Sequence, residues 1–126
     1  YQLEQVRHQG GILRQVYEFN NNYYVVARKG DTFRSIAADV DVSYRKLAKF
    51  NERDKNDVLE EGEMVWLQKK RRKAPKEYNG LIHLVENGES MYSISQKYGI
   101  RLKNLYKINH LDPDFTIRVG YQLRLR

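Results

Sequence analysis

Few side chains in this sequence of 126 residues stand in a pattern that could do catalytic chemistry. Hydrolysis of a glycoside, for example, needs two carboxyl groups that face each other across the scissile bond. Asp112 and Asp114 are close in sequence, but they fall in a predicted loop and face no obvious partner. Cysteine is absent, and no metal-ligand spacing relates the three histidines, which are His8, His83 and His110. The sequence therefore predicts no catalytic set, no metal site and no cofactor.

The densest charge lies in the run Lys69-Lys70-Arg71-Arg72-Lys73, in a chain whose net charge is +7. Such a run can bind phosphate backbones or act as a nuclear localisation signal. Nucleic-acid binders usually interleave basic residues with the recognition surface, whereas segments 24–67 and 82–125 are nearly neutral here. We therefore favour a solvated spacer, or a strap that contacts acidic residues of segment 24–67, over a nucleic-acid site.

A short motif that begins with glycine occurs twice in the chain. Residues 30–32 read Gly-Asp-Thr and residues 88–90 read Gly-Glu-Ser. A glycine lets a ligand approach the backbone closely. For Thr32 and Ser90 we favour helix caps over ligand contacts, because their hydroxyl groups accept hydrogen bonds from the free N–H groups at a helix start.

These motifs belong to an internal repeat. Residues 24–67 reappear without a gap as residues 82–125, an offset of 58 positions (82 less 24). The identical pairs include Gly30/Gly88, Ser35/Ser93, Ile36/Ile94, Leu47/Leu105, Lys49/Lys107, Asn51/Asn109, Gly62/Gly120 and Leu67/Leu125. A fixed period of this kind defines the architecture. Two copies of one small module favour repeated binding over a single asymmetric active site.

Each repeat reads as strand, helix, helix, strand. In the first, a β-branched strand over 24–27 precedes a helix whose apolar face is Phe33, Ile36, Ala37 and Val40. Ser43 is placed to cap a second helix, with Val42 and Leu47 as a hydrophobic staple. The first helices should end at Asp41 and Gly99, and the second at Asn51 and Asn109, where Asn replaces the usual left-handed Gly. Gly62 and Gly120 mark turns before closing strands, which must pair with the first strands to satisfy their backbones.

The expected organisation has four parts. Residues 1–23 form an extension in which 16–19 and 23–26 make a hairpin around an Asn-rich turn, and residues 1–13 stay unassigned. Residues 24–68 and 82–126 are the modules, and 69–81 is a basic linker. No stretch of about 18 apolar residues is present, so no membrane span is expected. The chain begins with Tyr1 rather than Met, which we interpret as a fragment or a processed form.

An ordered set of residues in each repeat has a familiar pattern. In the first repeat it is Tyr24, Val26, Gly30, Asp31, Thr32, Phe33, Ile36, Ala37, Leu47, Asn51, Leu59 and Gly62. In the second it is Leu84, Gly88, Ser90, Ile94, Tyr98, Gly99, Leu105, Asn109, Ile117, Gly120 and Leu123. The set resembles the lysin motif (LysM) family. The resemblance implies an α+β fold of two βααβ modules, each a two-stranded antiparallel sheet with two helices on one face.

The resemblance also implies a ligand, glycans built on N-acetylglucosamine such as peptidoglycan or chitin. The sugar would lie in a shallow groove between the loop before the first helix and the loop after the second. In the first repeat the implied contacts are Gly30, Asp31, Thr32, Phe33, Asn51, Val58 and Leu59. In the second they are Gly88, Glu89, Ser90, Met91, Asn109, Leu111 and Ile117. Because the second repeat departs from Gly-Asp-Thr, we expect the first to bind the sugar better.

Structural interpretations compete with these contacts. Phe33 and Met91 fit a core position, and Asn51 and Asn109 fit helix terminators first. The aromatic residues that could stack on a sugar, for which we favour core or interface positions, are Tyr44, Trp66, Tyr92 and Tyr106. The loop backbones are the better candidates for sugar contact.

The whole chain resembles the C-terminal tail of bacterial cell-wall glucosaminidases. This implies a non-catalytic segment of an exported protein, periplasmic or associated with the cell envelope, with a hydrolase domain upstream. Two alternatives stay open. One is a basic adaptor that binds nucleic acid or an anionic polymer through residues 69–73, and the other is a structural tail that packs on the missing domain.

Overall fold

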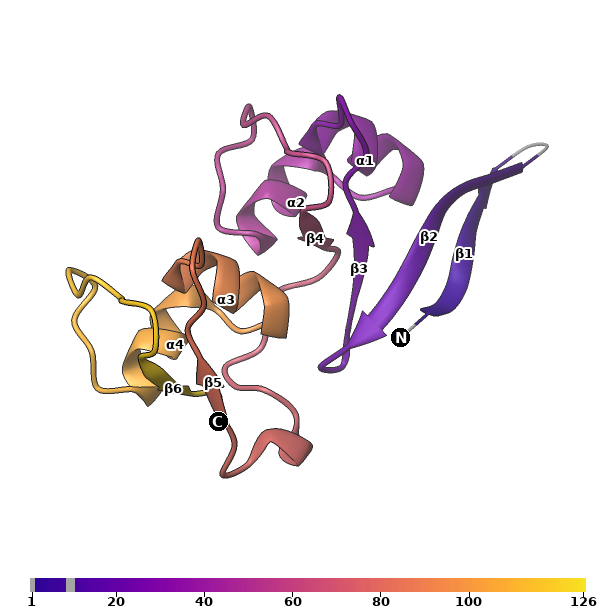
Figure 1. The fold of residues 1–126 in the computed structure, drawn as a ribbon. Coiled ribbons are helices and arrows are strands. Elements are labelled where there is room, and N and C mark those ends of the chain that lie inside the picture. Colours follow the sequence, from indigo (N-terminus) through magenta and orange to yellow (C-terminus); the bar gives the residue numbers. More distant parts are fainter. Residues whose placement is uncertain (1, 9–10) are drawn as a thin grey trace. The chain divides into compact units, whose positions relative to one another are not determined.

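The computed structural model describes residues 2–8 and 11–126, with side chains from residue 14 onward. The chain divides into two compact units, Tyr1–Lys70 (unit 1) and Arg71–Arg126 (unit 2) (Figure 1). The elements of unit 1 are β1 (Gln2–His8), β2 (Gly11–Phe19), β3 (Asn22–Val26), α1 (Phe33–Val40), α2 (Tyr44–Phe50) and β4 (Met64–Trp66). Those of unit 2 are the 3₁₀-helix η1 (Lys76–Tyr78), β5 (Ile82–Leu84), α3 (Met91–Tyr98), α4 (Leu102–Ile108) and β6 (Gln122–Arg124).

The first and last strands of each repeat pair antiparallel, as the sequence predicts. In unit 1, Tyr24 lies opposite Trp66 in the β3–β4 pair. In unit 2, Ile82 lies opposite Arg124 in the β5–β6 pair. The βααβ arrangement is therefore confirmed in both repeats.

Unit 1 extends this sheet to four strands in the order β1-β2-β3-β4. The predicted hairpin joins β2 to β3 through Asn20 and Asn21, whose φ angles are both 54°. Positive φ at both central residues is the condition for the two-residue turn that matches strand twist. β1 pairs with β2 and supplies the fourth strand, within the segment that the sequence left unassigned.

The connector between the repeats is not a solvated spacer along its whole length. Lys70 is 1% exposed and its ammonium group pairs with Glu52. This residue therefore behaves as the expected strap, which contacts acidic residues of segment 24–67. Burial lowers the pKa of Lys70, and the Glu52 carboxylate opposes that shift. Further on, the backbone N–H of Ala74 donates to Leu125 O at 2.8 Å, and Ala74 itself is buried in unit 2. This part of the connector therefore packs as part of unit 2.

The predicted caps of the first helices are confirmed. Thr32 Oγ1 accepts from the Ser35 backbone N–H at 3.1 Å, and Ser90 Oγ accepts from Ser93 N–H at 3.0 Å. Both helices then end at a left-handed residue, Asp41 in α1 and Gly99 in α3. The predicted Ser43 cap is wrong, because its side chain makes no cap hydrogen bond to α2.

The second helices end where expected but in a different way. Asn51 and Asn109 have φ angles of −99° and −97°, so the prediction that they adopt the left-handed conformation is wrong. The next residues, Glu52 and His110, take it instead, with φ of 57° and 55°. Two backbone bonds after α2, Glu52 N–H to Lys49 O and Arg53 N–H to Ala48 O, complete a Schellman motif.

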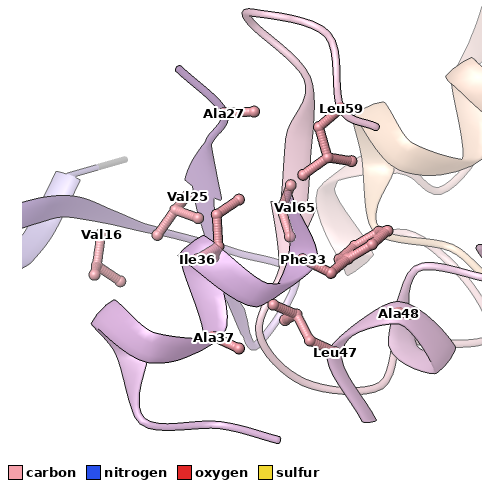
Figure 2. Close-up of a cluster of buried hydrophobic side chains, with 10 residues drawn as sticks. All are labelled: Val16, Val25, Ala27, Phe33, Ile36, Ala37, Leu47, Ala48, Leu59 and Val65. Carbon is pink, nitrogen blue, oxygen red and sulfur yellow. The ribbon is translucent and has the colours of Figure 1, made fainter. Parts of the chain in front are cut away.

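Each unit has its own hydrophobic core. In unit 1, side chains of β2, β3 and β4 meet side chains of α1 and α2, with Val25, Ile36 and Val65 near the centre (Figure 2). The unit 2 core consists of Ala74, Val85, Met91, Ile94, Ile100, Leu105, Leu123 and Leu125. The helix faces predicted from the 3.6-residue period are therefore the faces that pack on the strands.

Candidate functional site

The two loops expected to bind the sugar meet in unit 1 through their backbones. Thr32, before α1, forms an isolated antiparallel bridge with Val58 in the loop between α2 and β4. Leu59 N–H donates to Asp31 O across the same junction at 3.3 Å. In the part of unit 2 that the structure describes, Ile117 N–H makes no such bond to Glu89. The loop pair of unit 1 is thus closed at its base by a contact that unit 2 lacks.

The Asp31 carboxylate is occupied by partners within the protein. It accepts from Arg28 N–H at 2.7 Å, which closes its own loop, and from Ser35 Oγ–H at 2.8 Å. Arg14 on β2 binds both carboxylate oxygens, at 2.7 and 2.8 Å, and also reaches Asp39. The hydrogen bonds from Arg14 hold the pKa of Asp31 far below its usual range. Asp31 therefore anchors the loop before α1 to β2 of the N-terminal hairpin.

Glu89 has the same place in unit 2 but different partners. Its carboxylate accepts from Glu86 N–H at 2.8 Å and lies 2.8 Å from His83 Nε2. The other ring nitrogen of His83 is 2.7 Å from the Tyr98 hydroxyl. Burial alone would raise the pKa of Glu89, but the hydrogen bonds from Glu86 and His83 outweigh it and lower the pKa. The loop of unit 2 is thus anchored from within its own repeat.

Several predicted contact residues face inward. Phe33, Leu59 and Met91 are at most 4% exposed and belong to the cores, so their side chains support the loops from behind. Leu111 and Ile117 are half-buried and pack against the core of unit 2.

The two asparagines tie the second helix of each module to its closing strand. Asn51 Nδ2 donates to Leu47 O at 2.8 Å and to Trp66 O at 2.9 Å, while Asn51 Oδ1 accepts from Trp66 N–H at 2.8 Å. Asn109 makes the same three bonds with Leu105 and Arg124. A side chain bonded in this way fixes the end of the loop and has little left to offer a sugar.

The loops expose mainly backbone peptide groups and a small apolar surface to solvent. Gly30 and Gly88 are exposed and have φ angles of 85° and 86°. A Cβ built on either glycine would meet nothing within 4 Å, so the space beside the backbone is open. Val58 is 73% exposed at the rim of the unit 1 loops. The arrangement offers peptide groups and one apolar side chain to a neutral ligand.

Among the aromatic candidates for stacking, Trp66 is fully buried. Tyr44 is covered by Arg34, whose guanidinium carbon lies 4.0 Å from the ring centroid. The structure thus gives these two rings packing roles.

Comparison with known families decides the fold assignment. The family model described as "LysM domain" matches residues 24–68 and 83–126, which is more than half of the chain. The chain belongs to the LysM family. LysM domains are non-catalytic modules that bind peptidoglycan and other N-acetylglucosamine glycans. Among the described residues of this LysM chain, no helix is long and apolar enough to cross a membrane.

Several curated proteins match parts of this LysM chain. An autolysin of Enterococcus faecalis is 28% identical over 103 residues, 78% of the chain and 14% of that protein. The "Probable peptidoglycan endopeptidase LytE" of Bacillus subtilis is 27% identical over 105 residues, 81% of the chain and 31% of that protein. The "Uncharacterized lipoprotein YgeR" of Escherichia coli is 38% identical over 48 residues, 38% of the chain and 19% of that protein. The chain thus spans less than a third of each relative.

Among solved structures, the spore cortex-lytic enzyme SleL of Bacillus cereus matches with 28% identity and a TM-score of 0.36. The match covers 82% of the chain and 22% of that enzyme.

Proposed function

We propose that this LysM chain holds a peptidoglycan hydrolase domain of the same polypeptide on its substrate. The observation that carries the proposal is the twofold preservation of the module, with a capped first helix, an anchored loop and an exposed glycine in each unit. The autolysin and the endopeptidase that resemble the chain support a cell-wall hydrolase as its context. A protein with this task acts outside the cytoplasm, in the periplasm or the cell envelope.

The proposed ligand is the N-acetylglucosamine of the glycan strand, which chitin shares with peptidoglycan. An N-acetyl group offers one N–H, one carbonyl and one methyl group. Loop peptide groups beside Gly30 can meet the amide, and Val58 can meet the methyl group, which is a usual division of labour in small-ligand sites. Two modules on one polymer also raise the apparent affinity, because the second contact forms at high effective concentration.

Chemical-shift titration with a chito-oligosaccharide tests the proposal, with sedimentation of purified peptidoglycan in about 0.5 M salt to screen charge. Gly30→Val and Gly88→Val should each abolish the shifts of their own loop, since the side chain fills the open space and strains a positive φ. Gly80→Val is the matched control, because Gly80 has a φ of 79° and open space but lies in the connector. Loss of binding in Gly80→Val alone, or no wild-type binding in high salt, would exclude loop-mediated glycan recognition.

The basic-adaptor alternative can now be tested with fewer changes. Lys70 is buried and paired, so the exposed cations of the run are Lys69, Arg72 and Lys73. Replacing these three by Gln should leave glycan binding unchanged. Loss of peptidoglycan binding in that variant would instead support recognition of an anionic polymer through the connector.

A further inference from the structure

A second surface feature recurs at equivalent positions in the two modules. In unit 1 a hollow of about 470 Å³ is lined by Arg45, Lys46, Ala48, Lys49, Arg53, Asp54 and Lys55. In unit 2 a hollow of about 280 Å³ is lined by Lys103, Asn104, Tyr106, Lys107, Leu111 and Pro113. Every residue of the second set lies 58 positions after a residue of the first. The βααβ fold thus builds this hollow between its second helix and the loop that follows. In unit 1, Arg53 of the hollow also donates to Val58 O at 3.4 Å, so the hollow adjoins the loop that carries Val58.

The unit 1 hollow concentrates positive charge that the rest of the module does not neutralise. Arg53 pairs with Asp57 and Glu63 at 2.9 Å each, so its charge is already matched. Within the described part of the chain, Arg45, Lys46, Lys49 and Lys55 have no ion-pair partner. Repeat one is nearly neutral in sequence, yet its acidic residues Asp31 and Asp39 pair with Arg14 on β2, and Asp54 is the one carboxylate among the residues that line the hollow. Folding therefore separates the charges and leaves one face of α2 basic.

This clustering has no evident structural benefit. Arg45 and Lys49 are four residues apart on α2, a spacing at which like charges repel and weaken a helix. Unit 2 shows that the fold does not need the cations, because Lys46 corresponds to Asn104 and Lys55 to Pro113. The like-charge pair itself recurs as Lys103 and Lys107, so only the additional cations Lys46 and Lys55 are confined to one copy of the repeat, and these two point to a ligand of unit 1.

We propose that the α2 hollow of unit 1, lined by Arg45, Lys46, Lys49 and Lys55, binds carboxylate groups of the peptides attached to the glycan strand. The proposal rests on the proposed function, since it assigns a second subsite for the same polymer. Peptide carboxylates are attached to the strand that the loops hold, so they reach the hollow at high effective concentration. Unit 2 keeps two of the four cations, as Lys103 and Lys107, and has Asn104 and Pro113 in place of Lys46 and Lys55, so it lacks this specificity.

The test compares three ligands on the whole chain. These are a chito-oligosaccharide, a muropeptide with free carboxylates, and the same muropeptide with its carboxylates amidated. We expect the free muropeptide to bind about fivefold more tightly than the other two at low salt, which corresponds to about 1 kcal/mol for two exposed charge pairs, one each with Lys46 and Lys55. Lys46→Asn/Lys55→Gln should remove that gain and keep the oligosaccharide affinity. Lys69→Gln/Arg72→Gln changes net charge equally and should keep the gain.

The outcomes separate the two proposals. No preference for the free carboxylates in wild type, or an undiminished preference in Lys46→Asn/Lys55→Gln, overturns the subsite. A hollow that responds to inorganic polyphosphate but not to the muropeptide also overturns it. Failure of every sugar to shift the loops overturns the proposed function, whereas the peptide alone, without sugar, still reports on the hollow through the amide shifts of residues 45–49.

Discussion

Ion pairs between side chains hold the loop after the second helix in unit 1, whereas apolar side chains hold the equivalent loop in unit 2. Three positions in each loop do this work. In unit 1 they are Arg53, Asp57 and Glu63, in which the guanidinium group bridges two carboxylates at 2.9 Å. In unit 2 they are Leu111, Phe115 and Tyr121, in which the two rings lie 5.1 Å apart. The same three positions therefore carry two different chemical sets in the two copies of the module.

The anchoring of the first loop differs in a second way. Asp31 depends on Arg14, which lies outside the repeat on β2, whereas Glu89 uses His83 from β5 of its own repeat. β2 also pairs with β3, while β5 of unit 2 pairs only with β6. Unit 1 has become dependent on the N-terminal hairpin, and unit 2 is the more self-contained form of the module.

The largest effect should come from breaking that dependence with Arg14→Met. The change leaves the Asp31 and Asp39 carboxylates without their main partner, and the side chains of Arg14 and Asp31 are only 3% and 9% exposed. Loss of one member of a buried pair lowers the free energy of unfolding by about 4 kcal/mol. Trp66, the only tryptophan and fully buried in unit 1, reports unfolding of that unit by its fluorescence.

Arg28→Met is the matched control for this experiment. Arg28 also approaches Asp31, at 3.9 Å, but its side chain is 63% exposed. Exposed pairs contribute less than about 1 kcal/mol, so this variant should unfold almost like wild type. Equal effects of the two variants would show that Arg14 is not the anchor of the loop.

A smaller loss of stability is expected from replacing the two asparagines. Both make the same three hydrogen bonds, but Asn51 is buried and Asn109 is half-buried. Asn51 is 1% exposed, so Asn51→Ala leaves Trp66 N–H buried without its partner and should lower the free energy of unfolding of unit 1 by about 3 kcal/mol. Asn109 is half-buried, and water can replace its bonds to Arg124. Asn109→Ala should therefore lower the free energy of unfolding of unit 2 by only about 1 kcal/mol. Hydrogen exchange of the β4 and β6 amides measures both, and a larger loss in unit 2 would refute the role of burial.

These asparagines show what the sequence could and could not predict. Their place at the helix ends followed from local pattern, as did the caps Thr32 and Ser90, since all of these features involve residues within one turn. The bond from Asn51 to Trp66 spans 15 residues, and the pair of Arg14 and Asp31 spans 17. Such partners depend on how the strands dock, which residue types and spacing do not encode.

The sugar-binding residues illustrate the same limit. The sequence assigned the sugar to two loops of each module, but it could not separate residues whose side chains face outward from those that support the loop from behind. The resemblance to LysM implied that Asp31 contacts the sugar, yet its carboxylate accepts hydrogen bonds from Arg14 and Ser35. The basic hollow on α2 was missed, because the charges of repeat one nearly cancel when they are counted along the chain.

As the pH is lowered, unit 1 should unfold at a higher pH than unit 2. The pKa of Asp31 is lowered by Arg14 and that of Asp57 by Arg53, so both carboxylates stabilise unit 1 only while ionised. A lowered pKa gives stability that is complete above the unfolded value of about 4 and is lost as pH falls below it. For Asp31 the loss should reach about 2 kcal/mol at low pH.

Unit 2 has one such group, Glu89, so Trp66 fluorescence should change before the NMR signals of Leu123 do. Asp31→Asn should abolish most of that difference, and simultaneous unfolding of the two units in wild type would contradict it.

The smallest effect tests whether the two loop chemistries are interchangeable. The triple variant Arg53→Leu/Asp57→Phe/Glu63→Tyr gives unit 1 the apolar set of unit 2. Raising NaCl from about 0.05 to 1 M screens exposed ion pairs, so amide exchange at Val58 should speed up in wild type and stay constant in the triple variant. Single changes such as Arg53→Leu should be worse than the triple, because they leave two carboxylates facing an apolar side chain. If the triple variant unfolds the loop of unit 1, the position of each set must depend on neighbours outside the three residues, and the two modules would not share one tolerant backbone.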